Sequence, residues 1–208
     1  MKDFNSFAFI GPVMLILFTV ICSIRSPDYS YMTQYISDLA TEQALCEEVM
    51  NYLGIIPFGG SVVLFSLYLI RYFGRSFSHH VGYIFLFNIG VLFLLAGFFR
   101  CEPNYTFHNM SGETMIHNYS LFSGLVLAIL LQLYFGAHYF FKGFGKGFYL
   151  TSLITGLLSL VALYIMNTSG MGYEYKGLYQ RLFILLFCLW LIFSGYFLRN
   201  TETEVRKS

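Results

Sequence analysis

Long apolar stretches, broken by short polar connections, run along the whole chain. Six of them are long enough to cross a membrane, since a helix needs about 20 mostly apolar residues to span roughly 30 Å of hydrocarbon. They cover residues 7–24, 52–72, 81–99, 117–141, 148–166 and 179–198. Their apolar runs are continuous and lack the period-two alternation of transmembrane strands. The pattern predicts an all-α integral membrane protein, a six-transmembrane-helix bundle in a single domain.

The composition agrees with this interpretation. Of the 208 residues, 57% are hydrophobic and 11% charged, whereas soluble domains carry about 25% charged residues. The 12 Lys and Arg residues nearly balance the 11 Asp and Glu residues, so no large cationic surface is available for nucleic acid. The composition excludes a soluble enzyme and a nucleic-acid binder, and membrane lipid is the expected partner.

Basic residues near the span ends predict the orientation. With both termini in the cytoplasm (N-in/C-in), eight Lys and Arg residues lie inside and four outside, as the positive-inside rule favours. Eight of the eleven acidic residues then lie on the outer side. We expect a plasma (inner) membrane protein whose functional face is extracytoplasmic.

The first outer connection, residues 25–51, is the longest and is rich in tyrosine. From Asp38 onward it has the pattern of an amphipathic helix. One side of that helix carries apolar residues: Leu39, Cys46 and Met50. Ser37 or Asp38 suits the N-cap, where a short side chain accepts from free backbone amides. A capping role alone is enough to explain why Ser37 and Asp38 occur here. The alternative is that Asp38 is buried and binds a ligand or takes part in catalysis.

The connection before the fourth span carries most of the polar chemistry. If Ser111 caps that span, Glu113, His117 and Ser120 follow on one helical face. An ionisable group at the membrane edge normally faces the bundle or a water-filled cavity. A carboxylate one turn away would set the tautomer of His117 and raise its basicity. His117 is either a functional base or an imidazole held by helix–helix hydrogen bonds; His108 is a second candidate.

Arg181 opens the sixth span beside Gln180, with no other basic residue next to it. A guanidinium in that position needs an acidic partner, water or a lipid phosphate. The candidate acidic partners are Asp38, Glu102 and Glu174. A structural ion pair and a contact to an anionic ligand both remain open.

Two of the four cysteines lie on the predicted outer side. Cys46 and Cys101 would there meet an oxidising compartment, and we predict a disulfide between them. Cys22 and Cys188 lie within spans and are expected to pack as small apolar groups.

Several of these motifs occur together, in order, in one known family. They are Ile36-Ser37-Asp38-Leu39, Met50-Asn51, Cys101-Glu102-Pro103, His108…Ser111-Gly112…His117 and Gly177-Leu178-Tyr179-Gln180-Arg181. Over nearly its whole length the chain resembles the six-helix prokaryotic membrane family catalogued as domain of unknown function 998. The resemblance implies a six-helix bundle with a polar cluster at its outer face, and it implies no established reaction.

A weaker similarity raises the question of a metal. Transmembrane zinc hydrolases such as the alkaline ceramidases and the progestin/adiponectin-receptor-like proteins use a Ser, an Asp and three His, two of them in the last helix. The sixth span here contains no histidine. The candidate ligands for a zinc ion are His108, His117 and Asp38, and the third histidine of those hydrolases has no counterpart here. The cofactor therefore stays undetermined.

The sequence as a whole predicts an outer-face pocket for a lipid or small amphiphile. The candidate catalytic residues are His117, His108, Asp38 and Glu113, and the candidate binding residues are Ser37, Glu102, Ser111, Ser120, Gln180 and Arg181. In an enzyme, His117 would act as general base, oriented by Glu113 or Asp38, in hydrolysis or group transfer. The alternative is a non-catalytic scaffold, or a lipid- or partner-binding protein, whose polar cluster is structural.

Overall fold

The computed structural model describes residues 6–73, 77–103, 109–143, 145–168 and 173–205. The regular structure in these ranges is helical, and six helices are long and apolar enough to cross a membrane. The long helices are α1 (Phe7–Arg25), α3 (Ile56–Phe73), α4 (Phe77–Phe98), α5 (Gly112–Lys142), α6 (Lys146–Asn167) and α7 (Lys176–Val205). The short α2 (Glu47–Val49) and a π-helical turn, Met50–Ile55, lead directly into α3. The predicted six-helix membrane fold is confirmed, and the chain is a multi-pass membrane protein.

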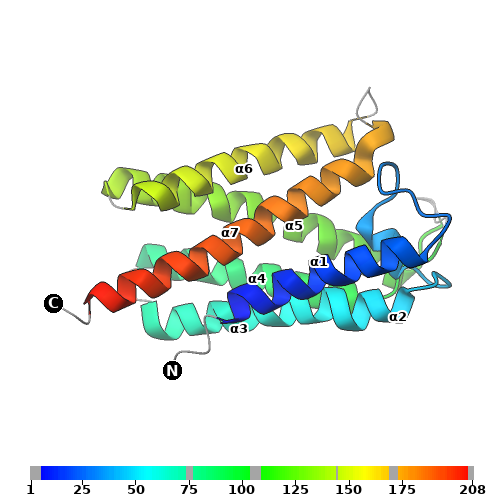
Figure 1. Cartoon of the computed structure of the whole chain (residues 1–208), viewed down its shortest axis with the longest axis horizontal. Coiled ribbons are helices and arrows are strands. Elements are labelled where there is room, and N and C mark those ends of the chain that lie inside the picture. The colour runs from blue at the N-terminus through cyan, green and yellow to red at the C-terminus, as the bar shows by residue number, and fades with distance from the viewer. Residues whose placement is uncertain (1–5, 74–76, 104–108, 144, 169–172, 206–208) are drawn as a thin grey trace.

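The long helices form a ring in chain order. Each packs against the next, and α7 returns to contact α1 (Figure 1). The two ends of the described chain lie at one end of the bundle. The connections from α1 to α2, from α4 to α5 and from α6 to α7 lie at the other end, which we call the loop end. The polar residues singled out in the sequence are therefore concentrated at one end of the molecule.

Aromatic side chains and close glycine contacts hold the helices together. Trp190 of α7 is buried and donates from its indole nitrogen to Ser152 Oγ of α6, at 2.8 Å. At the crossing of α3 and α4, a Cβ on Gly59 would lie 2.8 Å from the Gly90 carbonyl oxygen. The backbones can approach this closely only because both positions lack a side chain.

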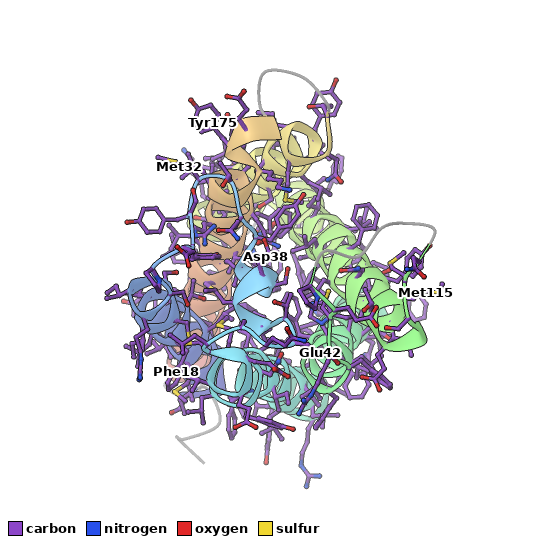
Figure 2. All side chains as sticks on the ribbon, turned by 90° about the vertical axis from the view of Figure 1, so that its right-hand side faces the viewer. Phe18, Met32, Asp38, Glu42, Met115 and Tyr175 are labelled. Atoms are coloured by element: carbon purple, nitrogen blue, oxygen red, sulfur yellow. The ribbon has the colours of Figure 1, made fainter. Side chains whose placement is uncertain are left out.

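The first connection folds back into the ring as a plug, defined here as the 3₁₀ helix Ile36–Ala40. It occupies the centre of the loop end, where Figure 2 labels Asp38. Its apolar side chains are buried: Ile36, Leu39 and Ala40. The plug closes this end of the bundle.

The continuous amphipathic helix expected from Asp38 onward is not formed. The chain leaves helical geometry after Ala40, Gln43 adopts a left-handed φ of 67°, and helix resumes only at Glu47. The Glu42 N–H instead donates to the Cys101 carbonyl, at 2.8 Å, and so joins the first connection to the third. Cys46 and Met50 are nevertheless buried, as the apolar pattern indicated.

Candidate functional site

Side chains from two neighbouring elements satisfy the ends of the plug. Gln180 of α7 accepts from the Ile36 N–H at 2.6 Å, and Asn51 donates to the Ala40 carbonyl at 2.9 Å. The N-cap is Tyr35 rather than Ser37 or Asp38. Asp38 instead lies three residues into the helix and accepts from the Tyr35 N–H at 2.8 Å, in a capping box. These bonds fix the plug between α7 and the start of α3.

Arg181 fastens the rest of the first connection to α7. Its Nη1 donates to three carbonyl oxygens, those of Tyr31 at 3.0 Å, Gln34 at 2.9 Å and Gly177 at 2.8 Å. Its Nη2 donates to the Tyr29 hydroxyl, whose ring the guanidinium also overlies. Within the described part of the chain, no carboxylate forms an ion pair with Arg181. Its positive charge therefore remains without a directly paired anion.

Tyr29 and Gly177 were not among the sequence candidates, although both are needed for this arrangement. Burial raises the pKa of Tyr29 to about 12, against the opposing effect of Arg181, so its hydroxyl stays protonated and donates to the Tyr35 carbonyl at 2.7 Å. The Gly177 N–H donates to the Met32 carbonyl, and a Cβ at Gly177 would overlap the Gln34 carbonyl. In the sequence, the motif from Gly177 to Arg181 was the feature that could have indicated this contact between α7 and the first connection.

Asp38 is within electrostatic range of two cations of α7, Lys176 and Arg181, and of His117 of α5. Burial raises the pKa of the Asp38 carboxyl above its ordinary value. The hydrogen bond from Tyr35 and the charges of Lys176, Arg181 and His117 oppose that rise. The plug thus brings Asp38 within electrostatic range of two other predicted site residues, Arg181 and His117.

His117 is fully buried and has a defined tautomer. Its Nδ1 lies 2.7 Å from the Ala96 carbonyl oxygen and 3.1 Å from that of Phe99, at the C-terminal end of α4. A carbonyl oxygen can only accept, so Nδ1 carries the hydrogen and Nε2 carries the free lone pair. Nε2 is buried and has no hydrogen-bond partner among the residues that the structure describes.

Glu113 does not orient this imidazole as expected. Glu113 is exposed and accepts from the Arg100 N–H at 3.4 Å. The backbone carbonyls at the end of α4 take the orienting role, because the last carbonyls of a helix lack partners within it. Ser120, on the same face of α5 as His117, is buried.

Glu102 and Ser111 form a second group, which caps α5. Ser111 Oγ accepts from the Thr114 N–H at 3.2 Å, which confirms Ser111 as the N-cap. Glu102 accepts from the Ser111 N–H at 3.2 Å and from Thr114 Oγ1 at 3.2 Å. These contacts give both residues a structural role at the start of α5.

His108, the other candidate in that connection, lies outside the described residues. Within the described ranges, no three His, Cys, Asp or Glu side chains gather as metal ligands would. The structure therefore assembles no metal centre from Asp38 and His117 together with other described residues.

All four cysteines are free and buried, so the predicted Cys46–Cys101 disulfide is not formed. The Cys46 thiol instead lies near the Cys22 thiol of α1. Cys101 donates weakly to the Glu102 carbonyl at 3.6 Å, and burial raises the pKa of the Cys101 thiol to about 12. Both predicted partners are thus engaged elsewhere.

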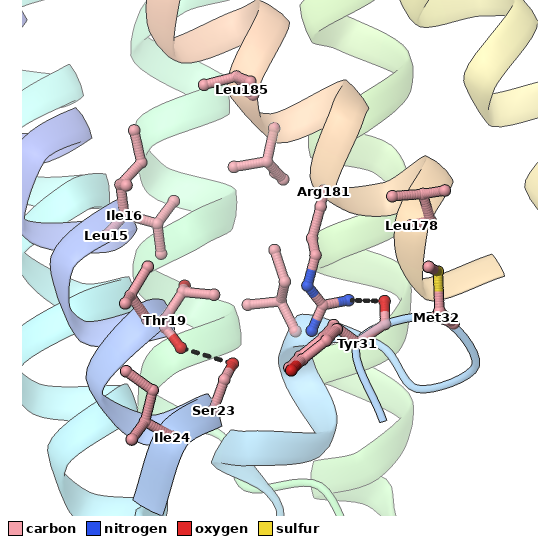
Figure 3. Close-up of a pocket in the computed structure, with 13 residues that line it drawn as sticks. Leu15, Ile16, Thr19, Ser23, Ile24, Tyr31, Met32, Leu178, Arg181 and Leu185 are labelled. Atoms are coloured by element: carbon pink, nitrogen blue, oxygen red, sulfur yellow. Dashed lines mark hydrogen bonds between the residues drawn. The ribbon is translucent and has the colours of Figure 1, made fainter. Parts of the chain in front are cut away.

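A groove of about 400 Å³ lies between α1 and α7, below the first connection. Its walls are mostly apolar side chains of the two helices, among them Leu15, Ile16, Val20, Leu178, Ile184 and Leu185. Figure 3 shows Arg181 at its loop end, bonded to the Tyr31 carbonyl, across from Thr19 and Ser23 of α1. The groove combines an apolar chamber with a cation at one end.

A smaller cavity of about 30 Å³ lies deeper in the bundle, under the plug. Ser37 and Gln180 contribute its polar groups, and Leu121 and Leu125 of α5 form part of its wall. The cavity shares Leu15, Ile36 and Ile184 with the groove. One layer of side chains therefore separates the two spaces.

A protein-family model, described as "Protein of unknown function (DUF998)", matches residues 9–195. The match covers most of the chain, and the chain belongs to this family. No curated protein and no solved structure matched it.

Proposed function

We propose that this member of the DUF998 family binds an anionic lipid or small amphiphile, with the apolar chain in the groove between α1 and α7 and the head near Arg181. The observation that carries this proposal is the groove itself, an apolar chamber with a cation at its end. Its volume of about 400 Å³ falls within the range of roughly 300–1,000 Å³ that is typical of ligand pockets.

The groove suits a ligand that arrives from the membrane. Its walls are the flanks of two helices that contain candidate membrane spans, and Ile16, Leu178 and Leu185 on these walls are partly exposed at the protein surface. A chain can therefore enter sideways from the bilayer without first crossing water. In the predicted N-in/C-in orientation, the ligand would come from the outer leaflet.

Arg181 supplies selectivity for the head. Its hydrogen bonds to backbone carbonyls orient the guanidinium but bring no negative charge to it. The cation still attracts a carboxylate or phosphate, and such a contact is stronger than one between neutral groups.

The test is photolabelling in vesicles of phosphatidylcholine. The probes are palmitate, phosphatidylglycerol and phosphatidylcholine, each with a diazirine on the acyl chain, and the labelled peptides are mapped by mass spectrometry. We expect the anionic probes to label the groove walls on α1 and α7. The two anionic probes distinguish a free amphiphile from a diacyl lipid.

Groove-filling variants give the matched comparison. Ile16→Trp and Leu185→Trp should each lower labelling about tenfold, equivalent to about 1.4 kcal/mol, while Leu157→Trp on the exposed face of α6 should leave it unchanged. Arg181→Lys should keep the preference for anionic probes, and Arg181→Gln should lose it. Equal labelling of the groove and the α6 face would contradict the proposal.

A further inference from the structure

The loop end of the groove carries polar side chains on both of its walls. Arg181 lies on the α7 wall, and Ser23 and Thr19 lie on the α1 wall, across from the guanidinium (Figure 3). Ser23 belongs to the last turn of α1, and the guanidinium bonds to the first connection. The walls around Leu15 and Leu185, farther from the loop end, are apolar. The head and the chain of a bound amphiphile therefore meet different parts of the groove.

The Arg181 guanidinium keeps hydrogen-bond donors that the protein does not use. A guanidinium has five N–H groups. Nη1 donates to three carbonyl oxygens, and Nη2 donates to the Tyr29 hydroxyl. The Nε–H and the second Nη2–H have no acceptor among the described residues, and Figure 3 shows two of the three nitrogens on the side away from the Tyr31 carbonyl. Two neighbouring N–H groups suit two oxygens of one carboxylate or phosphate.

The opposite wall, on α1, offers an acceptor and a donor. Ser23 Oγ lies 2.7 Å from the Thr19 carbonyl oxygen, which cannot donate, so the Ser23 hydrogen is used in this bond and the Oγ lone pairs remain. Thr19 Oγ1 is buried and has no partner among the described residues. A threonine in a helix has two favoured χ1 rotamers, so a rotamer change turns this hydroxyl from the wall into the groove.

A hydroxyl group on the ligand matches this wall. It donates to Ser23 Oγ and accepts from Thr19 Oγ1 at the same time. An ammonium group could also donate to Ser23, but none of the described residues that line the groove is acidic, and Arg181 repels a second cation. The groove therefore favours a neutral hydroxyl over an ammonium beside the anionic group.

We propose that the groove selects an anionic phospholipid with a free glycerol hydroxyl, binding the phosphate through Arg181 and the hydroxyl through Ser23 and Thr19. This inference rests on the proposed lipid binding and adds the chemical class of the head. A glycerol hydroxyl lies a few bonds from the phosphorus, so one head reaches both walls. The hydroxyl comes either from a headgroup glycerol, as in phosphatidylglycerol, or from the backbone glycerol of a lysophospholipid.

The test is competition for the groove in phosphatidylcholine vesicles that contain the full-length protein. Photoactivatable phosphatidylglycerol labels the groove, and four unlabelled lipids with the same acyl chain compete: phosphatidylglycerol, phosphatidylpropanol, its lyso form and phosphatidylethanolamine. Phosphatidylpropanol has the charge of phosphatidylglycerol but no hydroxyl, and its lyso form has only the backbone hydroxyl. We expect a hydroxyl to lower the half-competing mole fraction about fivefold, equivalent to about 1 kcal/mol for one hydrogen bond. The lipid that gains, phosphatidylglycerol or the lyso form, identifies the source of the hydroxyl.

Variants of the α1 wall connect this preference to the two side chains. Ser23→Ala should abolish the advantage of the hydroxyl-bearing lipid and leave competition by phosphatidylpropanol unchanged, whereas Ser23→Thr, which keeps a hydroxyl, should retain the advantage. Thr19→Val, which replaces the hydroxyl by a methyl group, should reduce it. Thermal unfolding of the same preparations checks that each variant is folded.

The outcomes separate this inference from the proposed function. Equal competition by phosphatidylglycerol, phosphatidylpropanol and the lyso form overturns the role of the hydroxyl and leaves anionic lipid binding intact. Stronger competition by phosphatidylethanolamine than by phosphatidylglycerol overturns it too, as does an advantage that persists in both Ser23→Ala and Thr19→Val. Absence of groove labelling in wild type would instead contradict the proposed function.

Discussion

At the residue scale, the polar side chains of the loop end serve mainly the backbone. Gln180, Asn51 and Arg181 all bond to main-chain groups of the first connection. A non-helical segment that enters a membrane bundle brings backbone N–H and C=O groups that need partners inside the protein. Most of the polar cluster is therefore the consequence of placing a plug there, and Asp38 and His117 stand out because backbone bonding does not exhaust their chemistry.

The raised pKa of Asp38 predicts a pH dependence of stability. The folded protein holds this proton more tightly than the unfolded chain, whose aspartates titrate near about 3.9. As the pH rises from the unfolded pKa through the folded one, the free energy of unfolding therefore falls. Asp38→Asn keeps an oxygen for the Tyr35 N–H but cannot ionise. Its free energy of unfolding should therefore equal that of wild type in acid and exceed it at neutral pH.

Thermal unfolding in detergent, followed by the fluorescence of Trp190, measures this difference. Trp190 is the single tryptophan and is buried, so its emission reports loss of the core. Asp38→Ala is the control: it cannot ionise either, and without the capping oxygen its free energy of unfolding should lie about 1 kcal/mol below that of Asp38→Asn at every pH. If the free energies of unfolding of wild type and Asp38→Asn differ by the same amount from acid to neutral pH, the raised pKa of Asp38 is contradicted.

The cysteine contacts give a second residue-scale prediction. With the Cys22 and Cys46 thiols near each other, an added oxidant such as diamide should join these two, and should not join Cys46 to Cys101. Peptide mapping under non-reducing conditions identifies the pair, and Cys22→Ser should abolish the cross-link while Cys188→Ser leaves it. A Cys46–Cys101 peptide in the oxidised wild type would restore the pairing that the sequence indicated.

The sequence revealed the individual residues better than their partners. Asp38, His117 and Arg181 are conspicuous because ionisable groups are scarce in an apolar chain. Their partners depend on how each helix is rotated, which the linear pattern does not contain. Glu113 follows the right spacing to reach His117, yet the end of α4 lies closer and its carbonyls bind the imidazole instead.

At the element scale, hydropathy predicted the spans, and the helices extend beyond them. The predicted fourth span begins at residue 117, whereas α5 begins at Gly112, as the expected N-cap at Ser111 indicated, because Ser111, Thr114 and Glu102 stabilise a polar first turn. Likewise, helical geometry begins at Glu47, ahead of the predicted second span at residue 52. Hydropathy marks the part of a helix that lies in lipid, and capping groups extend the helix beyond it.

The crossing of α3 and α4 offers a matched pair of glycines. A Cβ at Gly59 would lie 2.7–2.8 Å from backbone atoms of α4, whereas a Cβ at Gly60 would meet nothing within 4 Å. Gly59→Ala should therefore push the helices apart and lower the free energy of unfolding by about 1–3 kcal/mol. Gly60→Ala should be neutral or stabilising by up to about 1 kcal/mol, because alanine favours the helix.

Unfolding followed by Trp190 fluorescence measures both glycine variants. Gly90→Ala, on the other side of the same crossing, should resemble Gly59→Ala, since its Cβ would lie 2.8 Å from the Gly59 carbonyl oxygen. Equal stability of Gly59→Ala and Gly60→Ala would show that the two helices do not pack as closely as described.

At the scale of the whole molecule, the groove exists because the ring closes between its first and last long helices. Nothing in the sequence of α1 or α7 alone indicates that they meet, since this contact joins segments far apart in the chain. The sequence indicated a cation and apolar walls but not where they combine. Ring closure and the insertion of the plug together place Arg181 at the end of the groove.

The orientation of the ring decides which leaflet the groove faces. Because eight basic residues flank the spans on the side of the termini and four on the side of the loop end, we expect the loop end outside the cytoplasm.

Glu48→Cys, exposed at the loop end, and Lys142→Cys, exposed at the opposite end, test this with a membrane-impermeant maleimide. The four native cysteines are buried and should contribute little labelling. In intact cells Glu48→Cys should react, and Lys142→Cys should react only after permeabilisation. The reverse result would invert the bundle, and the lipid bound near Arg181 would then have to come from the cytoplasmic leaflet.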